Sequence, residues 1–309
     1  MRLLLTGSSG WLGRHLAPLL RQAGHEVTGL DVVAGADTQV LGSVADRALV
    51  DRTFAEAGIE AVIHAGGLHK PDIARNPAQT FIDVNVAGTL NLLEAAHGAG
   101  HDRFVFTSTT SLMISQAVRD EAAQGAIWLD EFSAPLEPRN IYGVTKLTAE
   151  GLCRLAHLEH GLNCVVLRTG RFFPEEDDTL VDLPGLNLKA NEFLNRRLTV
   201  EDAARAHLVA LEGADKVGFG VFLVSAPTPF AREDVVALKQ DAAGVVSRYF
   251  PDAAELYAKA GWKLPSSIGR VYDAGAIERR LGFRARTDFA AILEALRRGE
   301  PPPFQHVGA

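Results

Sequence analysis

A tyrosine and a lysine one helical turn apart are the side chains in this sequence best suited to moving a proton. Tyr142 and Lys146 are four positions apart, and this spacing puts both on one face of a helix. A free phenol has a pKa of ~10, and a neighbouring ammonium stabilises the phenolate and lowers that pKa. The pair could therefore act as an acid/base device near neutral pH. The alternative is a half-buried tyrosine beside a solvated lysine, because this spacing also recurs by chance on amphipathic helices.

A glycine-rich turn near the N-terminus is a candidate dinucleotide site. An apolar run at 2–6 precedes GSSGWLG at 7–13, and apolar residues at helical spacing follow. In such a strand–turn–helix unit, the first glycine permits the tight turn, the second lets backbone amides approach a pyrophosphate, and the third lets helix pack on strand. The candidate residues of this turn are Gly7, Gly10, Trp11, Leu12 and Gly13. The alternative is a glycine-rich turn that binds no ligand.

Asp31 indicates which dinucleotide would bind. A second predicted strand at 25–30 ends at Asp31, close to the ~20-residue offset at which an acidic side chain takes the ribose hydroxyls. Its carboxylate repels a 2′-phosphate, and the following Val32 and Val33 bring no cation to receive one. The sequence therefore favours NAD over NADP.

The elements that would position these residues alternate between strands and helices. Strands are predicted at 61–64, 103–107 and 163–168, with helices at 87–97 and around Tyr142 between them. Such alternation implies a parallel sheet covered on both faces, a doubly wound (Rossmann) α/β fold with ligands at the carboxyl ends of its strands. We assign 1–170 to an NAD-binding domain, completed by a late strand near 217–225 after a helix at 200–213. We assign 171–309 mainly to a small lobe that caps the substrate cleft.

Six motifs together resemble the extended short-chain dehydrogenases/reductases, the family of the sugar epimerases and dehydratases. They occur in the family's order and span nearly the whole chain: TGSSGWLG at 6–13, Asp31, HAGG at 64–67, NVAGT at 85–89, FTST at 106–109 and YGVTK at 142–146. The resemblance implies a catalytic triad of Thr109, Tyr142 and Lys146. The threonine would bind the reacting oxygen, the tyrosine would transfer the proton, and the lysine would hold the nicotinamide ribose.

The resemblance also implies further contact residues. Those for the cofactor are Val32, Ser43, Val44, Ala65, Gly66 and Gly67, with Ser43 standing where the family often has an aspartate on the adenine amine. Those for the substrate are His69, Thr110, Arg171 and Arg270. Each of these four has an alternative reading, as a surface side chain or a strand-end hydroxyl.

The sequence departs from the nucleotide-sugar enzymes of this family in the region that grips the nucleotide. Only about thirty residues separate Arg168 from the LTVED run at 198–202, and the Arg-x-Gly-Asp run near the C-terminus is replaced by LPSSIGR at 264–270. The short lobe is more similar to that of uronate dehydrogenases. However, the arginine that binds the carboxylate in those enzymes falls at Leu180, after an acidic stretch at 174–178.

Three functions remain open on these observations. The leading hypothesis is an NAD-dependent oxidoreductase that oxidises a secondary alcohol of a sugar-like or similarly polar small molecule. The alternative is an epimerase or dehydratase that keeps its NAD and reduces it transiently. A third hypothesis, from another class, is a redox-sensing regulator that binds NAD without catalysis, and the complete set of Thr109, Tyr142 and Lys146 argues against it.

Composition excludes other partners. The net charge of −7 and pI near 5.8 provide no basic surface for nucleic acid or an anionic membrane. No apolar run reaches the ~20 residues of a membrane span, and no leader segment precedes the first strand, so we expect a cytoplasmic protein. Cys153 and Cys164 lack metal-ligand spacing, and we expect two buried free thiols and no metal.

We also expect a homodimer. Family members commonly pair through two helices of each subunit, which correspond here to the helix after Asn85 and the helix that carries Tyr142. Five leucines supply apolar positions beyond those that the sheet needs: Leu90, Leu93, Leu147, Leu152 and Leu155.

Overall fold

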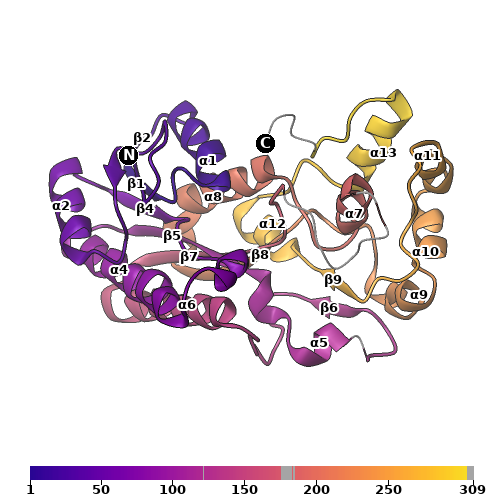
Figure 1. The fold of residues 1–309 in the computed structure, drawn as a ribbon, viewed down its shortest axis with the longest axis horizontal. Coiled ribbons are helices and arrows are strands. Elements are labelled where there is room, and N and C mark those ends of the chain that lie inside the picture. The colour runs from indigo at the N-terminus through magenta and orange to yellow at the C-terminus, as the bar shows by residue number, and fades with distance from the viewer. Residues whose placement is uncertain (121, 175–182, 184, 305–309) are drawn as a thin grey trace.

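A parallel sheet of seven strands is the frame of the molecule (Figure 1). The computed structural model of the chain describes all residues except 121, 175–182, 184 and 305–309. Within the described residues the strand order is β3-β2-β1-β4-β5-β7-β8, and every neighbouring pair is parallel. The strands are β1 (Arg2–Thr6), β2 (Glu26–Asp31), β3 (Val40–Leu41), β4 (Ala61–His64), β5 (Arg103–Thr109), β7 (Asn163–Thr169) and β8 (Phe219–Val224). The predicted doubly wound α/β fold is confirmed.

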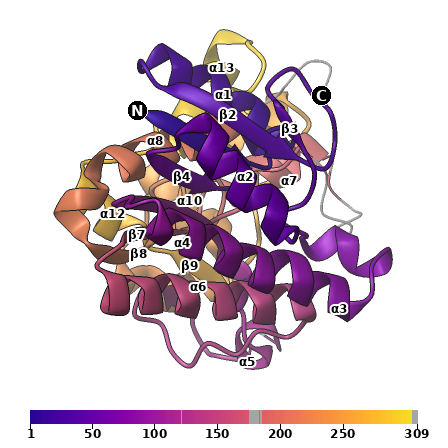
Figure 2. The ribbon, with the colours of Figure 1, turned by 90° about the vertical axis from the view of Figure 1, so that its left-hand side faces the viewer.

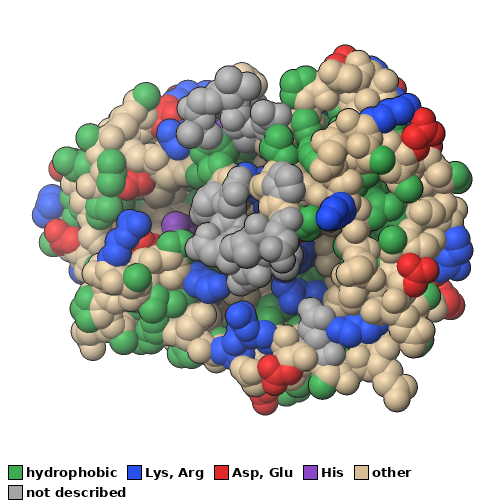
Figure 3. Space-filling view, turned by 45° about the vertical axis from the view of Figure 1, so that its right-hand side comes forward, with side chains coloured by type: hydrophobic (Ala, Val, Ile, Leu, Met, Phe, Trp, Pro, Cys, Tyr) green, Lys and Arg blue, Asp and Glu red, His purple; other side chains and the backbone are tan. Residues whose placement is uncertain are grey.

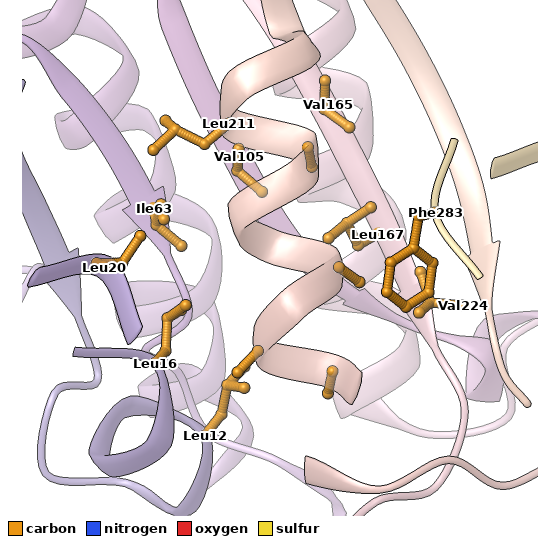
Figure 4. Close-up of a cluster of buried hydrophobic side chains, with 14 of the residues drawn as sticks. Leu12, Leu16, Leu20, Ile63, Val105, Val165, Leu167, Leu211, Val224 and Phe283 are labelled. Atoms are coloured by element: carbon orange, nitrogen blue, oxygen red, sulfur yellow. The ribbon is translucent and has the colours of Figure 1, made fainter. Parts of the chain in front are cut away.

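The middle residues of the central strands are apolar because both faces of the sheet are covered, whereas polar residues lie at their ends. Leu3 and Leu5 of β1 face one core cluster, whereas Leu4 faces the other, as the alternation of a strand requires. Helices α1 (Trp11–Gln22) and α8 (Val200–Val217) cover the first face, where their apolar side chains meet those of β4, β5 and β7 (Figure 4).

Three helices cover the opposite face: α2 (Arg47–Ala57), α4 (Gly88–Gly98) and α6 (Ile141–His160). Figure 2 shows α4 and α6 lying side by side along the sheet, with α2 beside α4. A short α3 (Ala78–Phe81) and a π-helical segment, Ile82–Ala87, lead into α4 without a break in the chain direction. This face therefore carries the helix with Tyr142 and Lys146.

The lobe forms at the carboxyl end of the sheet around a core of its own. Its small parallel sheet pairs β6 (Ile127–Leu129) with β9 (Arg270–Tyr272), so a segment from the first half of the chain contributes to it. The remaining helices are α5 (Gln116–Asp120), α7 (Gly185–Glu192), α9 (Val235–Gln240), α10 (Ala242–Tyr249), α11 (Ala253–Lys259), α12 (Gly275–Leu281) and α13 (Phe289–Arg298). The division of the chain at residue 170 stays a prediction.

Parts of two sequence-based expectations lie outside the described residues. These are most of the acidic stretch at 174–178 and Leu180, the residue that replaces the expected carboxylate-binding arginine. None of the described helices is long and apolar enough to cross a membrane.

Candidate active site

The strand order reverses between β1 and β4, and the two turns that follow these strands touch. Gly7, directly after β1, has φ +73°, and a Cβ at this position would lie 2.7 Å from the Cα and N of Gly66. A Cβ on Gly13 would lie 2.1 Å from the carbonyl oxygen of Gly7. Glycine is therefore required where the turn meets the loop after β4 and where α1 packs on the turn. A crevice at such a switch point is where doubly wound sheets bind ligands.

Helix α1 begins directly at this turn. Gly10 is its N-cap, and the Gly10 N–H donates to Gly7 O over 3.1 Å. Leu12 points its side chain into the core, and the Trp11 indole donates to Phe172 O over 3.2 Å, so these two residues present only backbone to the crevice. The first N–H groups of a helix have no acceptor within the helix and form an anion site.

Asp31 ends β2 beside the same turn. Its carboxylate accepts the Ser9 N–H over 3.0 Å and the Val33 N–H over 2.9 Å, and these bonds hold the side chain at the rim of the crevice. The Val32 side chain is exposed. The structure thus brings Asp31 and the glycine turn together, as the sequence predicts.

The other predicted cofactor residues differ in how they are placed. Gly66 and Gly67 line the loop after β4, and a Cβ on Gly67 would lie 3.6 Å from Lys146 Nζ. The Ser43 hydroxyl accepts the Ala45 N–H over 3.1 Å within its own turn. Val44 is a core residue, packed where a Cβ on Gly88 would lie 2.5 Å from it. Its side chain is therefore committed to packing against α4.

The first two turns of α6 carry Tyr142 and Lys146, near the carboxyl end of β5. The helix begins after Asn140, whose side chain accepts the Gly143 N–H over 2.9 Å as an N-cap. Both side chains are buried, at 9% and 5% exposure. Lys146 Nζ donates to Thr107 O over 2.9 Å and lies 4.7 Å from the centre of the Phe106 ring.

Thr109 is the threonine that reaches Tyr142. It is the last residue of β5, paired with Thr169 of β7; its hydroxyl accepts the Ser111 N–H over 3.1 Å and lies close enough to the Tyr142 phenol to lower its pKa. Thr110 turns away from the phenol, and its hydroxyl donates to Thr169 O over 3.2 Å. Thr107 and Ser108 are bonded elsewhere, to His207 and Glu150. Among the neighbouring hydroxyls, Thr109 is therefore the one that lies beside the Tyr142 phenol.

Burial, rather than the neighbouring ammonium, governs the ionisation of Tyr142. Loss of solvent raises the pKa of Tyr142 to about 12, and the hydrogen bond with Thr109 opposes this rise. Burial lowers the pKa of Lys146 to about 8, against the raising effects of Cys153 and Glu150. The lowering of the tyrosine pKa by Lys146 stays a prediction, and in this structure the ammonium donates to Thr107 O.

Among the predicted substrate residues, His69 has its ring in edge-to-face contact with that of Tyr142. Its ring centre is 6.5 Å from that of Tyr142 and 5.3 Å from that of Phe173, with edge-to-face geometry in both cases. Asp72 lies 3.3 Å from His69 Nδ1 and accepts the His69 N–H over 2.8 Å. Sequence analysis did not include Phe173, which forms part of the same aromatic group.

The two predicted arginines lie in different surroundings. Arg171 follows β7 and its Nε lies 3.6 Å from the buried Glu192, which also pairs with Arg196 and Arg197 at 2.8 and 2.7 Å. Arg270 lies on β9 in the lobe, and its buried Nε has no acceptor among the described residues. Figure 3 shows Lys and Arg side chains gathered around the hollow between the sheet and the lobe.

A buried ion pair behind the catalytic turn is absent from the sequence-based predictions. Arg168 of β7 binds Glu150 of α6 with bonds of 3.0 and 2.7 Å, and the Ser108 hydroxyl donates to the same carboxylate over 2.6 Å. Glu150 lies one turn beyond Lys146, at a spacing that could have placed it on the catalytic face. Among the described residues, no group of three or more His, Cys, Asp or Glu side chains could hold a metal ion.

The residues present fit a dinucleotide. A glycine cradle that tolerates no Cβ, helical N–H groups and an acidic side chain at the adjacent strand end are the features that a pyrophosphate and a ribose diol require. The fold and site thus define a dinucleotide-binding Rossmann protein with Thr, Tyr and Lys side chains beside the crevice.

Comparison with known proteins gives the family. Residues 3–181 match the model of the NAD dependent epimerase/dehydratase family, and the chain belongs to this family. The chain is similar to a UDP-glucose 4-epimerase of Azospirillum brasilense, 32% identical over 176 residues, which cover 54% of this chain and 48% of that protein. It therefore spans about half the length of this relative.

Two further relatives bear on function and fold. A uronate dehydrogenase of Pseudomonas syringae pv. tomato is 29% identical over 181 residues, covering 56% of this chain and 60% of that protein. The crystal structure of an Agrobacterium tumefaciens short-chain dehydrogenase/reductase superfamily protein with bound NAD covers 97% of this chain and 98% of that one, with a TM-score of 0.66 and 23% identity. The predicted resemblance, the enzyme class and NAD as cofactor are confirmed.

Proposed function

We propose that the chain is an NAD-dependent dehydrogenase that oxidises a secondary alcohol of a sugar-like or other small polar substrate, and that it works as a cytoplasmic homodimer. The observation that carries this proposal is that Thr109 lies beside the buried phenol of Tyr142, with the buried Lys146 one turn further along α6. A substrate hydroxyl group bound by both Thr109 and Tyr142 would lie at the carboxyl end of the sheet, where the Tyr142 oxygen could accept its proton.

The chain's own residues divide the work as follows. Thr109 orients the substrate oxygen, and the Tyr142 phenolate takes the hydroxyl proton as the alcohol becomes a carbonyl. When bound, NAD supplies the ring that accepts the hydride lost from the same carbon. Lys146, one turn along α6, binds the ribose and contributes positive charge that favours the phenolate. In the reverse direction the same phenol donates its proton, which suits a pKa of about 12.

The short segment that follows β7 supports a small substrate. Its two ends pair at a β-bridge between Arg171 and Arg197, and the Leu198 N–H donates to Arg171 O over 3.0 Å. Between these paired ends, the described residues contain one helix, α7, which leaves little chain to hold a nucleotide. The aromatic group of His69 and Phe173 beside Tyr142 would form one wall of a compact substrate site.

An NAD-retaining epimerase or dehydratase is the second candidate. The relative named UDP-glucose 4-epimerase favours it, because the same first oxidation begins both reactions. In that case the hydride returns to the substrate before release. The two candidates thus differ in whether reduced cofactor leaves the enzyme.

A substrate panel followed by NADH absorbance separates these candidates. Uronates, aldoses and nucleotide sugars would each be mixed with the protein and excess NAD. The proposal predicts NADH in equal amount to the oxidised product for an unactivated sugar or sugar acid. An isomerised or dehydrated sugar without net NADH would support the second candidate and contradict the first.

A further inference from the structure

A buried histidine links the loop of the dinucleotide crevice to helix α4. His64, at the end of β4, is 1% exposed; its Nδ1 lies 2.7 Å from the Thr6 hydroxyl and its Nε2 lies 3.1 Å from the Thr89 hydroxyl. The Thr6 hydroxyl also accepts the Gly66 N–H over 3.0 Å, and the Thr89 hydroxyl donates to Asn85 O over 2.7 Å.

The donors of this chain of bonds follow from counting hydrogens. Thr89 gives its one hydroxyl hydrogen to Asn85 O, since a carbonyl only accepts, so it must accept from His64 Nε2–H. Burial lowers the pKa of His64 to about 3, so the ring is neutral and its Nδ1 accepts from the Thr6 hydroxyl. Each polar group along this path then has a partner.

Asn85 continues the path to the catalytic helix. Its side chain makes two bonds with the backbone of Leu68, in the loop after Gly67: it accepts the Leu68 N–H over 2.8 Å and donates to Leu68 O over 2.9 Å. Its Nδ2 also donates to the Thr145 hydroxyl over 3.1 Å, and Thr145 donates to Tyr142 O over 2.9 Å. The π-helical turn at Ile82–Ala87 contains Asn85.

A second buried histidine, His207, holds the residue that binds Lys146. His207 of α8 contacts Ala203 O through Nδ1 and the Thr107 hydroxyl through Nε2, both over 2.7 Å. The carbonyl forces Nδ1 to be the donor, so neutral His207 accepts from Thr107. Thr107 in turn accepts the Lys146 ammonium at its main-chain oxygen.

We infer that this network, built on two neutral histidines with opposite tautomers, positions the Tyr142–Lys146 turn of α6 against the NAD-binding loop at 66–68. His64, Thr89, Thr145 and His207 are positioning residues, which act through the groups they hold. The role of the loop rests on the family's NAD dependence, whereas the catalytic role of the turn rests on the proposed function.

Thr89→Val tests the network with a matched control in the same chain. Valine has nearly the same shape as threonine but leaves the buried His64 Nε2–H without an acceptor. His64 then no longer links α4 to Thr6 and, through the Thr6 hydroxyl, to the Gly66 N–H. Thr53 of α2 is also buried, and its hydroxyl donates to the carbonyl four residues earlier, Leu49 O, as that of Thr89 does. It lies outside the network, so Thr53→Val reproduces the loss of a buried helical hydroxyl alone.

We expect Thr89→Val to weaken NAD binding about tenfold in a titration, and Thr89→Ser to restore it within about twofold. Thr53→Val should bind NAD as the unaltered protein does, even where its thermal midpoint falls equally. Unchanged affinity of Thr89→Val, or equal weakening by Thr53→Val, would overturn the inference. These readouts need no substrate, so they stand apart from the proposed alcohol oxidation.

Nitrogen NMR of the histidine rings tests the bond directions directly. The inference predicts that His64 carries its proton on Nε2 and His207 carries its proton on Nδ1, and that both stay neutral at pH 6 while exposed histidines titrate. The opposite tautomer at either ring, or titration of either ring near pH 6.5, would contradict the network.

Discussion

Residue spacing predicts that Tyr142 and Lys146 act as a pair, but burial decides how the phenol ionises. Tyr142 and Lys146 do share one face of α6, as four-residue spacing requires. Sequence alone does not reveal that the phenol is buried, and this burial raises the pKa of Tyr142 to about 12. The positive charge proposed for Lys146 would therefore have to act against the cost of burying the phenolate.

We expect Asp31 to set the preference for NAD over NADP. Its carboxylate is held at the rim of the crevice by the N–H groups of Ser9 and Val33, where a 2′-phosphate would be repelled. NAD should bind at least tenfold more tightly than NADP, a difference of about 1.4 kcal/mol, and Asp31→Asn should narrow this ratio. Parallel titrations with NAD and NADP measure this ratio. Asp51→Asn, at an exposed ion pair on α2, is the control and should leave the ratio unchanged. Equal affinities in the unaltered protein would refute this assignment.

Acid should destabilise the fold through its buried histidines. Burial lowers the pKa of His207 from 6.5 to about 4, so between these values the unfolded chain binds a proton that the folded chain does not. The free energy of unfolding should then fall as pH decreases, by roughly 2 kcal/mol from this residue between pH 7 and pH 5. Urea denaturation at pH 7 and pH 5 measures this free energy, and it should fall less for His207→Gln than for the unaltered protein. No difference between His207→Gln and the unaltered protein in this pH dependence would show that folding does not lower the pKa of His207.

At the scale of elements, an ion pair fastens α6 to β7. Glu150 and Arg168 are 6% and 4% exposed, and removing one charge leaves the other buried without its partner. Glu150→Gln should lower the free energy of unfolding by about 3 kcal/mol. Glu294→Gln, at an exposed pair with Arg298, provides the control and should change stability far less. Denaturant unfolding of both variants would reveal a structural role if only the first is impaired.

Elements with a strong local pattern were predictable from sequence, whereas pairings between distant segments were not. Ala61–His64 was predicted to the residue because its first three residues form an apolar run, as expected of a strand buried on both faces. The helix predicted at 200–213 runs on to Val217, where Gly218 ends it with φ +68°. The pairing of β6 with β9 joins segments more than a hundred residues apart, and no local pattern indicates it.

The site was predictable where one residue type is obligatory. Gly7 and Gly13 admit no side chain, so their spacing reveals the turn. Thr109 could be chosen only through the family resemblance, because strand register decides which hydroxyl meets Tyr142. The positions of His64 and Thr89 on the network depend on long-range contacts, which a single sequence does not display.

For the whole molecule, the outer face of α4 and α6 is the candidate dimer surface. Leu90 and Leu155 are 39% and 46% exposed there, together with Leu158 at 67%. Leu93 is a core residue at 3% exposure, and Leu152 packs against the core, so these two belong to the sheet and not to a partner. Exposed apolar side chains on two adjacent helices are typical of an isologous interface.

Sedimentation at micromolar concentration should show a dimer, since two helices per subunit bury on the order of 1,600 Å². Leu155→Glu should shift it toward the monomer, because a charge would be buried between subunits. Val236→Glu on α9 is a matched control, with 48% exposure outside this face. A 33.2 kDa monomer for the unaltered chain would remove the dimer from the account.

The central claim is that Tyr142 transfers the proton in an oxidation that reduces NAD, and Tyr142→Phe tests it most directly. With a substrate found in the panel, NADH formation and NAD affinity would be measured for this variant beside the unaltered protein. The account predicts nearly unchanged NAD binding, since the ribose contacts Lys146, and turnover lower by roughly 10²-fold or more, the usual scale for losing a positioned acid/base group. Near-normal turnover by Tyr142→Phe would show that another group moves the proton.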